Sequence, residues 1–143
     1  MIRALGTDDF DRWLELWAAY LDFYRGEVDA TTTEATFAKL CERRDGLFGL
    51  AGLGADGRLV GFAHCILHPS TWSRQPYCYL EDLFVERHAR GTGVARELLW
   101  AVYEEADRKG AARVYWETQE LNSPARSLYD QVAHRTSFIV YER

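Results

Sequence analysis

Residues 79–95 constrain the fold of this chain more than any other stretch of the sequence. They read YLEDLFVERHARGTGVA, a strand-like half followed by a loop that contains two glycines. The strand-like half alternates between two faces, with Leu80, Asp82 and Phe84 on one side and Glu81, Leu83 and Val85 on the other. A helical pattern follows the loop directly. A strand, a glycine loop and a helix N-terminus in this order predict an anion-binding site, because the first N–H groups of a helix have no partners within it.

The residues of the glycine loop distinguish between three kinds of phosphate site. A Walker loop needs a lysine followed by Ser or Thr after its last glycine, and this loop has no lysine. A dinucleotide fingerprint needs a third small residue at the position where Arg96 stands. The remaining pattern, formed by Arg90, Gly93 and Ala95, offers free backbone N–H groups and one cationic side chain. A loop of this kind suits a pyrophosphate.

The composition indicates one folded domain that spans residues 1–143. With 48% hydrophobic and 14% aromatic residues, a chain of this length can bury a substantial core. The net charge of −5 argues against binding to nucleic acid and mildly favours a cationic substrate or partner. The sequence shows no signal-peptide pattern and no apolar stretch of membrane-spanning length, so we expect no membrane contact and a cytoplasmic location.

The cysteines and histidines predict no metal site. Cys41, Cys65 and Cys78 lack the CxxC spacing of zinc sites, and we expect them to be reduced packing residues. His64 and His68 share one face of a predicted strand, but no acidic or sulfur ligand nearby in the sequence would complete a site. We therefore expect a protein without a metal ion.

Periodicity along the chain predicts a mixed α/β (α+β) domain. Strand patterns lie at residues 2–5, 47–53, 58–67, 79–85, 112–118 and 137–141, and helical patterns at 7–26, 31–46, 95–110 and 122–133. The second and third strands are joined by residues 54–57, Gly-Ala-Asp-Gly, which predict a hairpin turn. Residues 69–76, which lie between two prolines, are expected to form a loop. Thr7 and Thr31 are expected to cap the first two helices.

Four segments between residues 61 and 133 resemble the GNAT superfamily of N-acetyltransferases in their order and spacing. They are GFAHCILHP, YLEDLFV, RGTGVA and NSPARSLYDQVA. The second and fourth look most like the branch that contains polyamine, thialysine and histone acetyltransferases. The resemblance implies a mostly antiparallel twisted sheet with a splayed centre and about four helices, in which YLEDLFV is a bulged strand. It also implies acetyl-CoA as cosubstrate.

The resemblance assigns roles to residues at matching positions. The backbone of Phe84 and Val85 would pair with the pantetheine arm of acetyl-CoA. The residues expected around its phosphates are Arg90, Gly91, Thr92, Gly93, Val94, Ala95 and Arg96. Those expected around its more distant parts are Asn122, Ala125 and Arg126. Tyr129 matches the tyrosine that the family uses as a general acid.

The sequence departs from the family pattern near its last helix. Ala133 stands where many members have glycine, and there is room for one closing strand where most members have two. An open sheet edge at that point would favour pairing with a second copy, so we expect a homodimer.

Acetyl transfer to an amine requires the neutral amine, and this requirement suggests a task for the two carboxylates of residues 79–85. A lysine-like amine with a pKa of ~10.4 is neutral in only about one molecule in two thousand at pH 7. A carboxylate that takes the proton offsets much of this cost. Glu81 shares a face with Val85 in the simple alternation and matches the family's acid, so we predict that it is the base. Asp82 would attract or orient the cation; both could instead be surface or ion-paired carboxylates.

The end of the first predicted helix is the candidate acceptor side. Tyr20, Phe23 and Tyr24 pack in the core or line a substrate entrance, and Glu27 follows them closely. We predict that Tyr24 and Glu27 bind the acceptor together with Asp82. The leading function is acetyl transfer to a primary amine of a small molecule, a polyamine or an amino acid derivative. The alternatives are acetylation of a protein lysine or N-terminus, and binding of acyl-CoA without catalysis.

Overall fold

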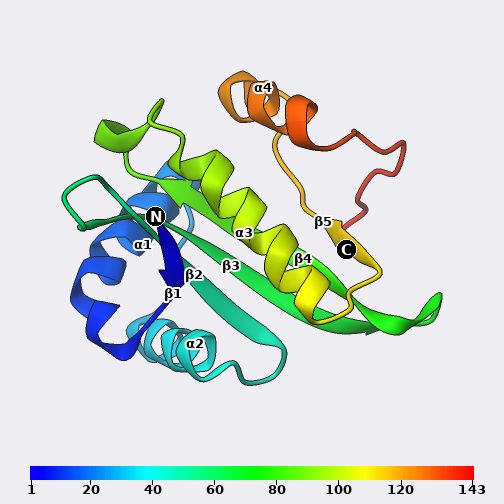
Figure 1. Ribbon diagram of the computed structural model, residues 1–143, viewed down its shortest axis with the longest axis horizontal. Helices are drawn as coiled ribbons and strands as arrows, with labels where there is room; N and C mark the ends of the chain where they lie inside the picture. Colours follow the sequence, from blue (N-terminus) through cyan, green and yellow to red (C-terminus); the bar gives the residue numbers. More distant parts are fainter.

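The computed structural model describes residues 1–143 and places helices on both faces of a five-stranded sheet (Figure 1). The strands are β1 (Ile2–Ala4), β2 (Leu47–Leu53), β3 (Leu59–Ser70), β4 (Ser73–Val85) and β5 (Arg113–Tyr115). The α-helices are α1 (Phe10–Tyr24), α2 (Ala30–Glu42), α3 (Val94–Arg108) and α4 (Ser123–Val132), and two short 3-10 helices are η1 (Thr7–Asp9) and η2 (Arg87–Ala89). None of the helices has the length and apolar character needed to cross a membrane.

The sheet has the strand order β1-β2-β3-β4-β5, and its neighbours are antiparallel except for the parallel pair of β4 and β5. The predicted mixed, mostly antiparallel fold is therefore confirmed. β5 pairs with β4 only from Tyr77 to Tyr79. Residues 80–85 of β4 have no neighbouring strand on that side, so the sheet is splayed, as the resemblance implied.

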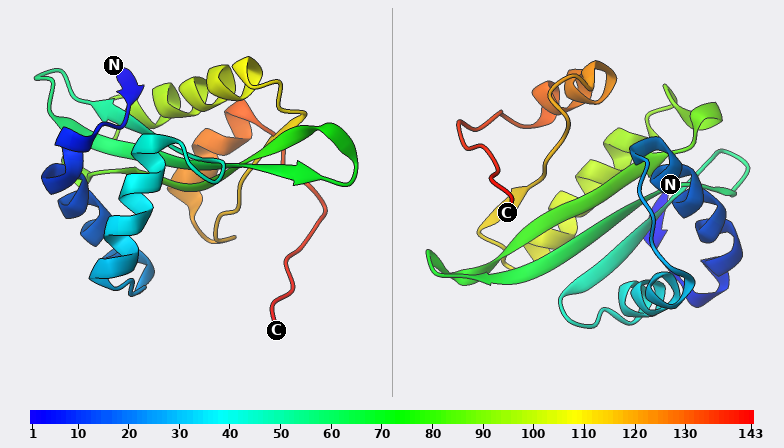
Figure 2. Two further views of the ribbon diagram at one scale, coloured as in Figure 1. Left: turned by 90° about the horizontal axis from the view of Figure 1, so that it is seen from below. Right: turned by 180° about the vertical axis from the view of Figure 1, so that it is seen from behind.

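Two layers of apolar side chains hold the helices on the two faces of the sheet. On one face α1 and α2 meet the sheet through Trp13, Leu16, Phe37, Leu40, Ala51, Phe62 and Phe84. On the other face α3 meets it through Leu50, Cys65, Leu80, Leu98, Leu99 and Val102, with Leu128 and Tyr129 of α4 packed against this cluster. The helical members recur every three or four residues, which gives each helix one apolar face. Figure 2 shows α1 and α2 on the opposite side of the sheet from α3.

A β-bulge interrupts β4 at Glu81 and changes which residues share a face. His64 of β3 lies opposite Asp82 and Cys65 lies opposite Leu80, so Glu81 is an extra residue without a partner in β3. Leu80 consequently packs in the α3 cluster, whereas Phe84 packs in the cluster under α1 and α2. The predicted alternation, with Leu80, Asp82 and Phe84 on one face, is wrong because the bulge shifts its phase.

The structure also corrects two predicted segments. Residues 69–76 are not a loop, because β3 continues to Ser70 and β4 begins at Ser73, with these two residues paired across a tight turn. Residues 137–141 are not a strand, because residues 133–143 contain no helix or strand at all. The tail leaves the body of the molecule (Figure 2), and its apolar side chains are exposed: Phe138, Ile139, Val140 and Tyr141.

The helix caps differ from the prediction as well. Asp29 caps α2, since its side chain accepts a hydrogen bond from the N–H of Thr32 at 2.7 Å, and Thr31 lies inside the helix. Thr7 begins η1 instead of capping a helix, and the carboxylate of Asp9 accepts from the N–H of Gly6 at 2.8 Å. In both places an ionised carboxylate is the acceptor, which makes a stronger bond than a hydroxyl.

Candidate active site

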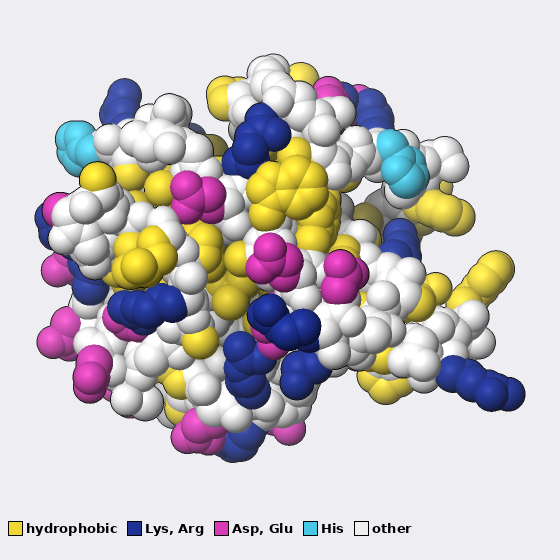
Figure 3. All heavy atoms as spheres, in the orientation of Figure 1, with side chains coloured by type: hydrophobic (Ala, Val, Ile, Leu, Met, Phe, Trp, Pro, Cys, Tyr) yellow, Lys and Arg dark blue, Asp and Glu magenta, His cyan; other side chains and the backbone are white.

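An open cavity of about 500 Å³ lies where the glycine loop, the end of β4, α4 and the last turns of α1 meet. The predicted cosubstrate residues that line it are Phe84, Val85, Arg90, Gly91, Gly93, Val94, Ala95, Arg96, Asn122 and Ala125. Tyr24 and Tyr129 line it as well, whereas Thr92 and Arg126 do not. Figure 3 shows hydrophobic side chains gathered where α4 meets the body of the molecule.

The glycine loop presents an unbroken series of free backbone donors to this cavity. The N–H groups of residues 91–96 have no hydrogen-bond acceptor, and the first bond of α3 runs from Glu97 to the carbonyl of Gly93. Gly91 and Gly93 adopt positive φ angles of 77° and 92°, which residues with a side chain rarely adopt. These turns bring the donors of the loop and the N-terminus of α3 together, and such a concave set of N–H groups binds anions.

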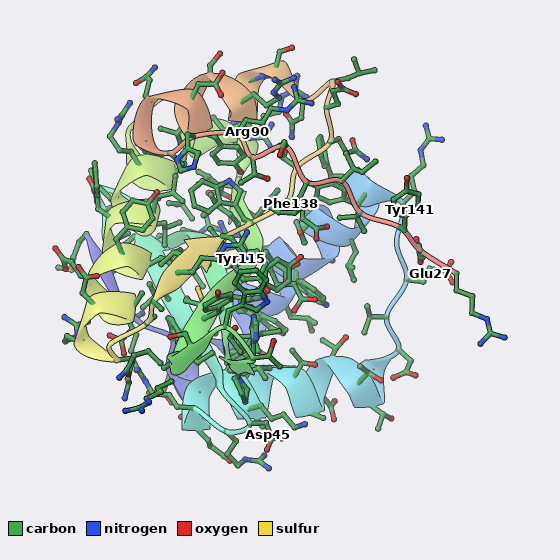
Figure 4. All side chains as sticks on the ribbon, turned by 90° about the vertical axis from the view of Figure 1, so that its right-hand side faces the viewer. Glu27, Asp45, Arg90, Tyr115, Phe138 and Tyr141 are labelled. Carbon is green, nitrogen blue, oxygen red and sulfur yellow. The ribbon has the colours of Figure 1, made fainter.

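Arg90 is held beside the loop by two contacts. Its Nε donates to the carbonyl of Val85 at 3.0 Å, and its guanidinium carbon lies 5.9 Å from the centre of the Phe84 ring. The remaining nitrogens of the guanidinium make no hydrogen bond within the protein. Figure 4 shows Arg90 beside α4. Arg96, at the start of α3, instead donates to the side chain of Gln131 at 2.5 Å and so joins the loop to α4.

Another wall of the cavity, besides the glycine loop, is formed by α4. Asn122 caps this helix by accepting from the N–H of Ala125 at 3.4 Å, as predicted, and both residues line the cavity. Arg126, on the other hand, donates to the carbonyl of Glu120 at 2.6 Å. Two of the three predicted contacts on this helix therefore border the cavity.

Tyr129 extends from α4 into the same cavity. Its ring packs edge-to-face on Trp116 with 5.4 Å between the ring centres. Burial, with a smaller effect from Tyr24, raises the pKa of Tyr129 to about 12. The hydroxyl therefore keeps its proton at neutral pH and is able to donate a hydrogen bond.

Glu81, the bulge residue, and Asp82, which is paired with His64, occupy different environments. Burial raises the pKa of Glu81, the negative charge of Asp82 raises it further, and His64 opposes these effects. A raised pKa brings a carboxylate closer to the range in which a general base is useful. The Asp82 side chain is 16% exposed and is bound by His64, at 2.9 Å between Oδ2 and Nδ1.

Tyr20 and Tyr24 connect these carboxylates with the cavity. Both tyrosines line it, and burial together with the charge of Asp82 raises the pKa of each. For Tyr20, hydrogen bonding to Asp82 and the charge of Glu81 also contribute. The acceptor side predicted from the sequence therefore lies beside the cavity, although neither carboxylate is part of its wall.

Glu27 lies apart from this group. It lines a separate, shallow groove together with Asp22, Gly26 and Asp29 at the end of α1. Figure 4 shows it on the segment between α1 and α2. The structure therefore does not bring Glu27 to the cavity.

The hydrogen-bond partners of His64 were not predicted from the sequence, and neither was the pairing of β3 with β4 that places one of them. No group of three or more His, Cys, Asp or Glu residues is placed to hold a metal ion. His64 lies between Trp13 and Asp82 and hydrogen bonds to both. The two partners are brought together by the hairpin of β3 and β4, whose register places His64 opposite Asp82. Two consecutive strand patterns in the sequence indicate such a hairpin.

The sequence matches known acetyltransferases over most of its length. The model of the Acetyltransferase (GNAT) family matches residues 12–133. The D-amino-acid N-acetyltransferase HPA3 of Saccharomyces cerevisiae is 33% identical over 144 residues, which cover 100% of this chain and 89% of that protein. The thialysine N-epsilon-acetyltransferase of Caenorhabditis elegans is 40% identical over 63 residues, which cover 44% of this chain and 39% of that protein.

A solved structure has the same fold. AAC(6′)-Iy, in complex with the bisubstrate analogue CoA-S-monomethyl-acetylneamine, superposes with a TM-score of 0.85 at 22% identity, covering 100% of this chain and 96% of that one. The match of the family model and the full-length similarity to a relative above 30% identity decide the assignment. The chain belongs to the GNAT acetyltransferase family and is an acyl-CoA-dependent N-acetyltransferase.

Proposed function

We propose that residues 1–143 act as one acetyltransferase domain, which moves the acetyl group of acetyl-CoA to a primary amine of a small molecule. The observation that carries the proposal is that three features border one cavity: the free N–H groups of the glycine loop, the open edge of β4, and Tyr129. A pyrophosphate, an amide-containing arm and a thioester follow one another in acetyl-CoA. The three features suit these three parts in that order.

The order of these three features along the cavity suggests how acetyl-CoA would bind. The N–H groups of residues 91–96 and the guanidinium of Arg90 would hold the pyrophosphate, with Arg96 near a phosphate. The backbone of Phe84 and Val85, on the edge that β5 leaves open, would pair with the amides of the arm. Asn122 and Ala125 would contact it from α4. Thr92 and Arg126 stay predictions, because neither lines the cavity.

Glu81 and Tyr129 are the residues we propose for proton transfer. Glu81 would remove the proton from the acceptor, directly or through water, so that the neutral amine attacks the thioester carbon. The bond from that carbon to sulfur then breaks, and Tyr129 would supply a proton to the departing thiolate. The proton that the nitrogen loses as the amide forms would restore the proton of Tyr129 by way of solvent. The products are an amide and free CoA thiol. The raised pKa of Glu81 and the retained proton of Tyr129 both support these directions of transfer.

The acceptor we propose is a polyamine or an amino acid derivative. Two carboxylates, Glu81 and Asp82, lie beside the tyrosines that line the cavity, and a field of this sign favours a cationic amine. Relatives of the chain are named for D-amino acids and for thialysine, which are small amines. Glu27 is not part of this proposal, because it lines another groove.

Thiol release tests the proposed function. The purified protein is mixed with acetyl-CoA and a panel of polyamines, D- and L-amino acids, thialysine, aminoglycosides and lysine-containing peptides, and free thiol is measured over time. We expect turnover with one of the small amines. Turnover restricted to peptides would replace the small-molecule acceptor with a protein acceptor. Binding of acetyl-CoA without release on any amine would contradict catalysis altogether.

A homodimer is the second part of the proposal. The outer edge of β5 has no neighbouring strand, and residues 138–141 of the tail are apolar and between 70% and 90% exposed. An open edge and an unpacked apolar segment are both stabilised by pairing with another chain. Light scattering is expected to give twice the mass of the chain, and Ile139→Asp to shift the mass toward the monomer. A monomer at all concentrations would contradict the proposal.

A cytoplasmic location stays a prediction from the sequence. The three cysteines of the chain are free thiols, which is compatible with a reducing compartment.

A further inference from the structure

A buried histidine joins α1 to the acceptor side of β4. His64 is 3% exposed, and its ring stacks on Phe62 with 4.3 Å between the ring centres. Both ring nitrogens have partners: Trp13 Nε1 lies 3.0 Å from Nε2, and Asp82 Oδ2 lies 2.9 Å from Nδ1. The proton transfers proposed above do not use this residue.

Trp13 determines which nitrogen of His64 carries the proton. An indole N–H only donates, so Nε2 must accept and is unprotonated. In the neutral ring the proton is then on Nδ1, which donates to the carboxylate of Asp82. Trp13 is fully buried and stacks on Trp17 at 5.7 Å, so the donor is held in place.

Asp82 interacts both with this histidine and with Tyr20, which lines the cavity. One of its oxygens is occupied by His64. Tyr20, which lines the cavity, lies beside the same carboxylate, and so does Glu81 at the bulge, because the charge of Asp82 affects both groups. A carboxylate that His64 fixes on one side and that faces Tyr20 on the cavity side is suited to hold an ammonium ion.

Building on the proposed function, we propose that His64 is a positioning residue. Its Nδ1–H bond holds Asp82 in the orientation that binds the acceptor as an ammonium ion, before Glu81 removes the proton. The acceptor is therefore a cationic amine at the moment of binding. His64 acts through Asp82 and does not touch the reacting atoms.

Two substitutions at His64 separate positioning from packing. Leu removes both hydrogen bonds, whereas Asn offers an amide N–H near the position of Nδ1 and so restores the donor to Asp82. We expect His64→Leu to raise the KM for the amine about 10- to 100-fold, the range expected for losing a hydrogen bond to a charged group. The KM for acetyl-CoA should change less than about twofold, and His64→Asn should recover most of the loss.

A double-mutant cycle tests the route through Asp82. If His64 acts through this carboxylate, His64→Leu should add little to the effect of Asp82→Asn on the KM for the amine. Additive effects would overturn the proposal. So would equal losses in His64→Leu and His64→Asn, or parallel changes in both KM values, since those indicate damage to the fold.

The tautomer can be measured on the unaltered protein. The ¹⁵N chemical shifts of the His64 ring are expected to show a proton on Nδ1 and none on Nε2, even if the variants do not fold. A proton on Nε2 would overturn the positioning role and leave the proposed function standing. The opposite result, no thiol release by a protein with the expected tautomer, would overturn the proposed function.

Discussion

Replacing Glu81 with glutamine is expected to lower kcat/KM for the amine about 10²- to 10⁴-fold, the range observed for loss of a general base. Glutamine keeps the size of the side chain but cannot take the proton of the acceptor. The bulge makes this position suitable for a base, because Glu81 has no cross-strand partner and no hydrogen bond or ion pair within the protein that would engage it. Thiol release at saturating acetyl-CoA, with varied amine, is the measurement.

The pH dependence identifies the group that causes the loss. Burial and the charge of Asp82 raise the pKa of Glu81, so the active carboxylate forms as the pH rises through a value above that of an ordinary glutamate. Activity of the unaltered enzyme should therefore increase across this range, and Glu81→Gln should lose that limb of the profile. Glu104→Gln, on the exposed face of α3, is the control and should leave both rate and profile unchanged. An unaltered rate in Glu81→Gln would assign the base elsewhere.

Replacing Tyr129 with phenylalanine is expected to lower kcat ten- to a thousandfold, within the usual range for a general acid. The ring still packs on Trp116 and still lines the cavity, so the dissociation constant for acetyl-CoA should barely change. Because the CoA thiol, with a pKa of ~8.5, is already a competent leaving group, the loss should not exceed that range. Single-turnover kinetics and direct binding of acetyl-CoA measure the two quantities separately.

Tyr103→Phe is the matched control for this substitution. The hydroxyl of Tyr103 donates to the carbonyl of Val132 at 3.0 Å and so supports the end of α4 without lining the cavity. We expect its kcat to stay within about twofold of the unaltered enzyme. If both variants lose activity equally, loosening of α4 explains the effect and Tyr129 is not the acid. Since the pKa of Tyr129 is raised to about 12, the unaltered enzyme should show no alkaline loss from this group below that pH.

The anion-binding loop could be predicted from the sequence because its geometry is local. Two glycines with positive φ and the first turn of α3 place six consecutive N–H groups without acceptors, and no distant residue is needed for this. The apolar faces of the helices are local in the same sense, since a period of 3.6 residues sets them. The Asn122 cap of α4 also depends only on neighbours in the chain.

Other features of the fold depend on contacts between distant segments and were not predicted. The bulge at Glu81 exists only in the pairing of β4 with β3, so alternation within residues 79–85 did not reveal it. The same pairing extends the two strands through residues 69–76, where two prolines had predicted a loop.

The candidate site likewise combines local features with contacts between distant segments. The series of free N–H groups in the glycine loop is local in origin, because backbone conformation and helix termini follow from residues adjacent in the chain. Two features depend on the tertiary structure instead. Tyr24 and Tyr129 line one cavity, and His64 hydrogen bonds to both Trp13 and Asp82. The physical reason is that a hydrogen bond between side chains 18 or 51 residues apart depends on strand register and helix docking, which no local period encodes.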